Sequence, residues 1–252
     1  MMRLTVLGAS PACQNPGGAC SGYLLEQDGV ALLIDCGSGV VGRLQQYIAP
    51  EKLQAVLISH MHADHTMDLI PYRYYLYFTG EGQHIPRPNL YLPPGGHERL
   101  LGLSRLQDPS TAFFTDTFAV QEYDPLATLA VGPFSISFVP VHHIPHTYGI
   151  RIIGDACLAF SADSGPCDAL ATVAQGSDLF LCECANSEHS DFPFHLTSRQ
   201  AGAVAQQAGA RRLLLTHRWW VYGQDAAVSE AQEQFTGPVA LAREDMQIVI
   251  AP

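Results

Sequence analysis

The sequence predicts an α/β fold in a single domain covering residues 1–252, and three observations support this. Short apolar segments typical of β-strands recur along the chain, each ended by a polar or small-residue turn. Some are continuously apolar, such as Val56 to Ile58, which is typical of strands buried on both faces of a helix-covered sheet. Residues 197–208 have the periodicity of an amphipathic helix.

Composition excludes several classes of protein. With 47% apolar and 15% charged residues, the chain is neither disordered nor a coiled coil. The net charge of −11 argues against long-range capture of duplex nucleic acid, which depends on Lys and Arg. Seven cysteines without a CxxC pair favour reduced thiols and a cytoplasmic location. No apolar run approaches the roughly 20 residues that span a bilayer, so we expect no membrane partner.

The strands are expected in the following order. Residues 1–10 are interpreted as a first strand, followed by strands at residues 30–34, 56–58, 134–141, 149–153, 157–160, 179–181, 213–215 and 247–250. Phe134, Ile136 and Phe138 alternate with serines, which is the period-two pattern of a half-exposed strand. Gly154 and Asp155 lie between two of these segments and predict a hairpin turn.

Helices are expected in fewer places, at residues 40–48, 64–77, 98–106, 197–208 and 226–235. For the helix at 197–208, Thr197 and Gln200 form a capping-box pattern and Gly209 marks the end. In the helix at 64–77, Pro71 is expected to introduce a kink. The Pro- and Gly-rich residues 85–96 are expected to form a loop with a short strand inside it.

Four metal-binding side chains crowd the segment after the apolar strand at residues 56–58. They are His60, His62, Asp64 and His65. His60 and His62 are two residues apart in an extended chain, so their side chains point to the same side. Asp64 and His65 face a neighbouring position, because the chain turns into the helix there. Three imidazoles and a carboxylate suit Zn²⁺ or a similar transition metal. A surface turn needs no such density of ligands, so we predict a metal site.

Three further strand ends carry similar side chains. His142 and His143 follow residues 138–141, Asp163 follows residues 158–161, and His217 follows residues 213–216. A lone histidine at a strand end is more often a hydrogen-bonded structural residue. Together, however, these side chains supply the ligands that a pair of metals would need. Two metals about 3.5–4 Å apart clamp the attacking and leaving oxygens in phosphoester hydrolysis.

These motifs resemble those of the metallo-β-lactamase superfamily, and within it the ribonuclease Z-like phosphodiesterases. The resemblance rests on the HxHxDH turn at residues 60–65, the segments 17–25 and 32–39, Phe160-Ser-Ala-Asp163-Ser-Gly-Pro166 and Leu214-Leu-Thr-His217. It runs in order from residue 4 to about residue 225. The fold that it implies is a four-layer αββα sandwich with two metal ions at one edge.

The resemblance also implies a ligand set. His60, His62 and His143 would hold one ion, Asp64, His65 and His217 the other, and Asp163 would bridge them. The choice of His143 over His142 rests on the family's spacing to an aromatic-Gly pair, here Tyr148-Gly149. Zinc is the first choice for the two divalent ions, with Mn or Fe open as alternatives. Asp35 is expected to hydrogen-bond the histidine-rich turn from behind.

Two short motifs resemble the ribonuclease Z-like branch in particular. They are Glu183-Cys-Ala-Asn186 and His195-Leu-Thr-Ser198, and in that branch a histidine at the position of His195 assists phosphodiester cleavage. His195 also precedes a helix N-terminus, which favours a bound anion. The long Gly/Pro-rich arm of the tRNA-processing members is replaced by a short hairpin in residues 143–163. We therefore expect a small phosphodiester substrate and no structured tRNA.

The expected function is that of a dinuclear metal-dependent hydrolase. The substrate would be a cyclic nucleotide or a short oligonucleotide end, attacked by a metal-bound hydroxide. Asp64 would orient the hydroxide or take its proton, and His195 would assist the leaving group. A carboxylic-ester, lactone or thioester hydrolase on the same centre is the alternative, and a non-catalytic binding module is a further one.

Two aromatic features and the assembly state stay open. The run from Tyr72 to Phe78 fits core packing or a subunit contact better than stacking on a base. Trp219 and Trp220 follow His217 and would line the substrate pocket or pack in a dimer interface. A homodimer is one option for the assembly.

Overall fold

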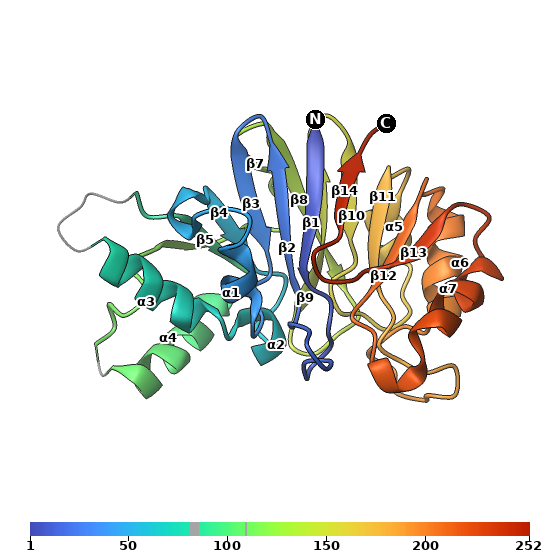
Figure 1. Cartoon of the computed structure of the whole chain (residues 1–252), viewed down its shortest axis with the longest axis horizontal. Coiled ribbons are helices and arrows are strands. Elements are labelled where there is room, and N and C mark those ends of the chain that lie inside the picture. Colours follow the sequence, from blue (N-terminus) through green and yellow to red (C-terminus); the bar gives the residue numbers. More distant parts are fainter. Residues whose placement is uncertain (81–85, 109) are drawn as a thin grey trace.

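The computed structural model describes residues 1–80, 86–108 and 110–252, with the side chains of residues 224 and 225 outside the description. Two seven-stranded mixed sheets lie face to face, and helices cover the outer face of each sheet (Figure 1). This is the four-layer αββα arrangement that the resemblance implies. Among the described helices, none is both long and apolar enough to cross a membrane.

The first sheet comes mainly from the N-terminal half of the chain. Its strands, in spatial order, are β14 (Gln247–Ile250), β1 (Met2–Gly8), β2 (Gly22–Gln27), β3 (Val30–Ile34), β4 (Ala55–Leu57), β5 (Asn89–Leu92) and β6 (Ala119–Glu122). Its outer face is covered by α1 (Val40–Leu44), α3 (Leu69–Thr79) and α4 (Gly96–Gln107), and the short α2 (Ala63–Thr66) lies at the edge of the sandwich (Figure 1). A short 3₁₀ helix, η1 (Pro50–Lys52), precedes β4. The middle strand pairs, β3 with β4 and β4 with β5, are parallel.

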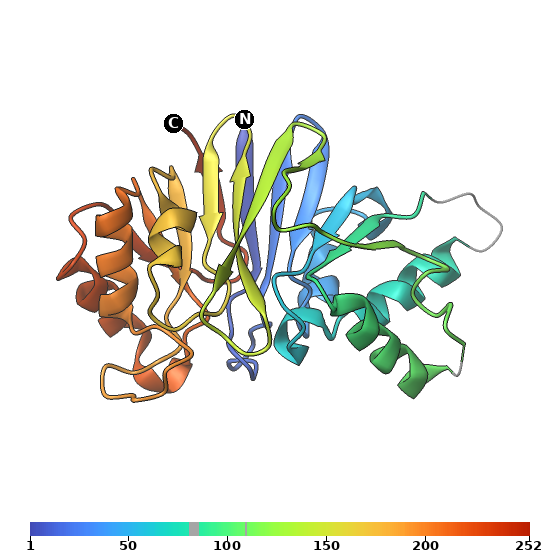
Figure 2. The same cartoon turned by 180° about the vertical axis from the view of Figure 1, so that it is seen from behind.

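The second sheet contains the C-terminal half. Its strands, in spatial order, are β13 (Val239–Leu241), β12 (Leu213–Thr216), β11 (Leu179–Glu183), β10 (Cys157–Phe160), β9 (Thr147–Ile153), β8 (Phe134–Val141) and β7 (Leu129–Val131). Its outer face is covered by α5 (Ala169–Ala174), α6 (Ser198–Ala208) and α7 (Gln224–Gln232), with η2 (Trp220–Tyr222) before α7 (Figure 2). Because β10, β11 and β12 are parallel neighbours, their carboxyl ends meet at one edge.

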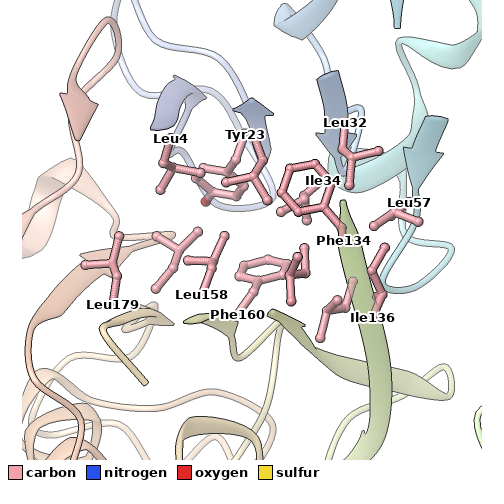
Figure 3. Close-up of a cluster of buried hydrophobic side chains, with 14 of the residues drawn as sticks. Leu4, Tyr23, Leu32, Ile34, Leu57, Phe134, Ile136, Leu158, Phe160 and Leu179 are labelled. Atoms are coloured by element: carbon pink, nitrogen blue, oxygen red, sulfur yellow. The ribbon is translucent and has the colours of Figure 1, made fainter. Parts of the chain in front are cut away.

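The main core lies between the two sheets. Leu4, Tyr23 and Leu32 project from the first sheet toward Phe134 and Phe160 of the second (Figure 3). Each of these side chains is at most 2% exposed, and the Tyr23 and Phe160 rings pack with centroids 5.4 Å apart. The predicted alternation along β8 is confirmed, because Phe134, Ile136 and Phe138 face this core.

Several sequence predictions are confirmed in detail. The strands expected at residues 30–34, 134–141, 157–160 and 247–250 have the predicted bounds. Helix α6 has the complete capping box between Thr197 and Gln200, and Gly209 ends it in the left-handed conformation. The short strand expected within residues 85–96 is β5, although residue 85 lies outside the described ranges.

The prediction of one kinked helix at residues 64–77 is wrong. Two helices, α2 and α3, occupy this stretch and separate at Asp68, whose N–H donates to the Cys36 carbonyl and whose carboxylate accepts from the Val41 N–H. Pro71 lies in the first turn of α3, where a missing N–H costs no intrahelical bond, so it introduces no kink there. The helix expected at residues 40–48 ends at Leu44.

Candidate metal centre

The histidine-rich turn connects β4 to α2 at the edge of the sandwich opposite the two chain termini (Figure 1). All three residues of β4 are buried between β3 and β5, so the chain leaves the sheet at a fixed position. His60 and His65 are fully buried in the turn, and Asp64 is 7% exposed. The predicted ligands on this turn therefore converge from the sheet edge rather than from a free surface loop.

Three imidazoles form one half of the site. The Nε2 atom of His60 lies 3.0 Å from Nδ1 of His62, and Nε2 of His143 lies 3.3 Å from that same atom. Tetrahedral ligands with bonds of about 2.0–2.1 Å stand about 3.3 Å apart, so the spacing fits a shared cation. The ring of His143 belongs to this group, whereas His142 is exposed and packs against Phe194.

A carboxylate and two imidazoles form the other half. The Oδ2 atom of Asp64 lies 3.3 Å from Nε2 of His65 and 3.1 Å from Nε2 of His217. His217 reaches this point from the end of β12, where its φ of 56° places it in the left-handed region. A non-glycine residue there is strained, and such strain collects at functional sites.

Asp163 lies between the two halves. Its Oδ2 atom lies 3.8 Å from Nε2 of His60 and 4.0 Å from Nε2 of His143. Its Oδ1 atom lies 3.3 Å from Nε2 of His65 and 3.5 Å from Nε2 of His217. One carboxylate oxygen thus faces each half, which is the arrangement that a bridging ligand requires.

Asp35 holds the turn from behind, as the sequence predicts. Its carboxylate accepts hydrogen bonds from the Ser59 N–H (2.8 Å), the Ser59 hydroxyl (2.9 Å) and Nδ1 of His65 (2.7 Å). Ser59 Oγ also contacts Nδ1 of His60 at 3.1 Å, and Nδ1 of His143 donates to the Phe194 carbonyl at 2.9 Å. These bonds leave the Nε2 lone pairs facing the centre, which is how outer partners orient ligand histidines.

The charge states of several groups suit a metal. Burial lowers the pKa of His60 well below its usual value and that of His143 to about 4, so both imidazoles are neutral. Burial alone would raise the pKa of Asp64, but the neighbouring His65 and His217 hold it well below its usual range. Metal ligands must be neutral imidazoles and ionised carboxylates, so these residues fit a bound cation.

His65 provides a further indication. Its Nε2 atom is buried and has no hydrogen-bond partner among the described residues. Burial would lower its pKa, but the carboxylates of Asp163, Asp35 and Asp64 raise it well above the usual value. A cation at this point would offset the negative charge of these three carboxylates and would bind Nε2 of His65, which has no hydrogen-bond partner among the described residues.

His195 stands beside these halves. Its ring lies 5.1 Å from that of His143 and 5.7 Å from that of His217, between centroids. Its Nδ1 atom donates to Oε1 of Glu183 at 2.8 Å, while Glu183 also accepts from the Ser164 and Ala185 N–H groups. Burial lowers the pKa of His195, but the hydrogen bond and charge of Glu183 outweigh this and raise it to about 9. His195 can therefore hold a proton next to the centre.

Sequence reasoning did not assign a role to Glu183. In the sequence it is only part of a motif, but in the structure it ends the buried strand β11 and is 1% exposed. A carboxylate just past an apolar strand was the pattern that identified Asp163, so the same pattern could have identified Glu183.

The open aromatic features lie in different environments. Tyr72 is buried and donates to the Pro50 carbonyl, whereas Tyr77 and Phe78 of the same helix are 49% and 63% exposed. The run therefore divides between core and surface. Trp220 is 53% exposed, and its backbone N–H donates to Oδ1 of Asn15.

Comparisons with known proteins identify several similar chains. Residues 2–226 match a protein-family model described as "Anti-Pycsar protein Apyc1". Rv1339 of Mycobacterium tuberculosis is 38% identical over 94% of this chain and 88% of its own length. The ribonuclease Z of Thermobifida fusca is 27% identical, covering 98% of this chain and 94% of its own.

The metallo-hydrolase YhfI of Bacillus subtilis is similar in both sequence and structure. Its sequence is 34% identical over 96% of this chain and 97% of its own length. Its crystal structure, described as a metallo-β-lactamase fold protein, matches with a TM-score of 0.87 and 31% identity over 98% of both chains.

Proposed function

Because this chain belongs to the Apyc1 family, we propose that it has phosphodiesterase activity. The family is a ribonuclease Z-like group of metal-dependent hydrolases in the metallo-β-lactamase superfamily. The substrate would be a small diester, such as a cyclic nucleotide or the end of a short oligonucleotide. The observation that carries the proposal is the hydrogen-bonded pair of His195 and Glu183 beside the metal-ligand cluster.

Two divalent ions would be held by the seven predicted ligands. His60, His62 and His143 would bind one, Asp64, His65 and His217 the other, and Asp163 both; Zn, Mn and Fe all suit this donor set. When bound, such ions would lower the pKa of a water between them and offset the charge that grows on the phosphoryl oxygens.

The chain's own residues supply the proton transfers. The ionised Asp64 would orient the attacking water and take the proton that this water loses. As the water oxygen bonds to phosphorus, the bond to the leaving oxygen breaks, and His195 would give that oxygen a proton. An alkoxide is a poor leaving group, so a proton donor at this point favours phosphodiester cleavage. Glu183 would position the imidazole, because it accepts from Nδ1 and leaves Nε2 free.

The size of the substrate is supported by the β8–β9 connection. Only residues 142–146 join these strands, so no long arm extends from this hairpin. The net charge of −11 also disfavours a large polyanion. Both observations favour a small diester over a structured RNA.

The test is a substrate panel with the purified, metal-loaded protein. Bis(p-nitrophenyl) phosphate and nucleoside cyclic phosphates would be compared with a lactone, a carboxylic ester and a thioester. We expect turnover of the phosphodiesters, at least about tenfold faster than that of the others. Preferred cleavage of the lactone, ester or thioester would instead establish the alternative hydrolase. Elemental analysis of protein purified without added metal identifies the ions.

A further inference from the structure

The loop between β11 and α6 presents an exposed phenyl ring beside His195. Phe192 is 53% exposed, yet its ring stacks on the His195 imidazole with centroids 5.6 Å apart and 30° between the planes. His195 in turn stacks on His217 at 5.7 Å and 30°. Phe192 is therefore one ring removed from the candidate metal centre.

The backbone of Phe192 is held on both sides by one buried asparagine. Nδ2 of Asn186 donates to the carbonyls of Phe192 (2.7 Å) and His195 (2.9 Å). The Ser190 hydroxyl donates to Oδ1 of Asn186 (3.1 Å) and accepts from the Phe192 N–H (3.2 Å). The exposed ring and the proton donor are therefore fixed relative to each other.

The loop also packs directly on segments that carry the metal ligands. The ring of Phe194 lies 5.5 Å from that of Phe192 and 6.3 Å from that of His143. A Cβ atom at Gly165 would lie 1.7 Å from the Pro193 carbonyl oxygen, so only glycine permits this close approach after Asp163. The phenyl ring thus belongs to a rigid wall of the site rather than to a separate surface patch.

We infer that Phe192 is a specificity-determining residue that stacks on a planar ring, such as a nucleobase, carried on the leaving-group side of the substrate. This inference rests on the proposed function, because His195 protonates the leaving oxygen and the group attached to that oxygen comes to lie next to Phe192. Stacking tolerates any base, since every base has a π face. Asn186 and Ser190 are already bonded within the loop, so we expect ring stacking, not base-specific hydrogen bonding, to dominate.

The first experiment uses two substrates with the same scissile bond. Adenosine 3′,5′-cyclic phosphate is compared with ribose 3′,5′-cyclic phosphate, which lacks the base, on the loaded wild-type enzyme. We expect the base to raise kcat/KM about tenfold, mainly through KM. Phe192→Ala should reduce this advantage to about twofold, Phe192→Trp should keep it, and Phe192→Leu, apolar but not planar, should resemble alanine. An equal loss on both substrates would overturn the inference.

A binding measurement separates this inference from the proposed function. Calorimetric titration of adenosine 5′-monophosphate and ribose 5-phosphate into wild type and Phe192→Ala, at matched metal content, reports the base contribution without turnover. We expect about a tenfold Kd ratio in the wild type that disappears in the variant. If no phosphodiester is cleaved, the proposed function fails, but this ratio still supports stacking. Equal Kd values for the two ligands in the wild type refute the stacking role.

Discussion

The turn at residues 59–66 and the loop at residues 186–195 border the same centre but are fixed by different means. In the turn, His60 and His65 are fully buried and Asp35 lies directly beneath them. In the loop, Asn186 donates to the carbonyls of Phe192 and His195, and Phe192 remains half exposed. Ligand geometry is thus set by the core, whereas the proton donor lies on a surface segment and is held to the core through Glu183. Substitutions in the turn should therefore cost metal, and substitutions in the loop should cost turnover alone.

The largest effect is expected for Asp64→Ala or His217→Ala. Each removes a proposed ligand of the second ion, so we expect hydrolysis of an aryl phosphodiester to fall by about 10³-fold or more. Circular dichroism should show an unchanged fold, and elemental analysis should show about half the metal. Unchanged turnover in either variant would remove the second ion from the mechanism.

Substitution of the proton donor tests the loop side. His195→Ala should lower kcat by roughly 10²–10⁴-fold with full metal content, because the leaving oxygen loses its general acid. The loss should be smaller for a p-nitrophenolate leaving group, which needs little protonation, than for an alkoxide. Loss of metal in this variant would mean that His195 is a metal ligand and not the proton donor.

A change behind the turn should act through the metal. Asp35→Asn keeps the shape but loses the charge that orients His65, and such outer partners typically contribute 10–100-fold in metal affinity or activity. Asp28→Asn is a matched control, because Asp35 and Asp28 both have a positive φ (57° and 51°) but Asp28 lies in an exposed hairpin turn. Equal metal affinities in the two variants would argue against a role for Asp35.

The smallest effect is expected at the base of the loop. Asn186→Ala removes the bonds to two carbonyls, each worth about 1 kcal/mol, so kcat should fall about tenfold with metal retained. Hydrogen exchange should accelerate in residues 187–195 and stay slow in residues 59–66. Faster exchange in both segments would mean that they do not move independently.

The sequence predicted the site best where a side chain that can bind a metal directly follows an apolar strand. Ligand-type side chains directly after apolar strands identified Asp163 and His217, and the structure brings both to the histidine-rich turn. His142 and His143 both follow β8, and neighbouring residues of an extended chain point to opposite sides, so only one of them can face the centre. The choice between them depended on the spacing in the family. The geometry places His143 there.

Other features depend on tertiary context and were missed. Strands β6 and β7, at the ends of the two sheets, together with β13, have three or four residues and are partly exposed, so they lack a strong hydrophobic pattern. The six-residue helix α5 is too short to show a clear period. The break between α2 and α3 is held by contacts of Asp68 with Cys36 and Val41, which are distant in sequence.

The three parallel strands β10, β11 and β12 end in a row, and each contributes one side chain: Asp163, Glu183 and His217 just beyond or at the strand end. The spacing of the row is dictated by backbone pairing, at about 4.8 Å per strand, and not by the side chains themselves. A substitution of a single terminal residue therefore changes the chemistry at the edge while the strand pairing stays the same. The middle place, occupied by Glu183, holds no proposed ion ligand, so a substitution there would change the setting of His195 without removing a ligand.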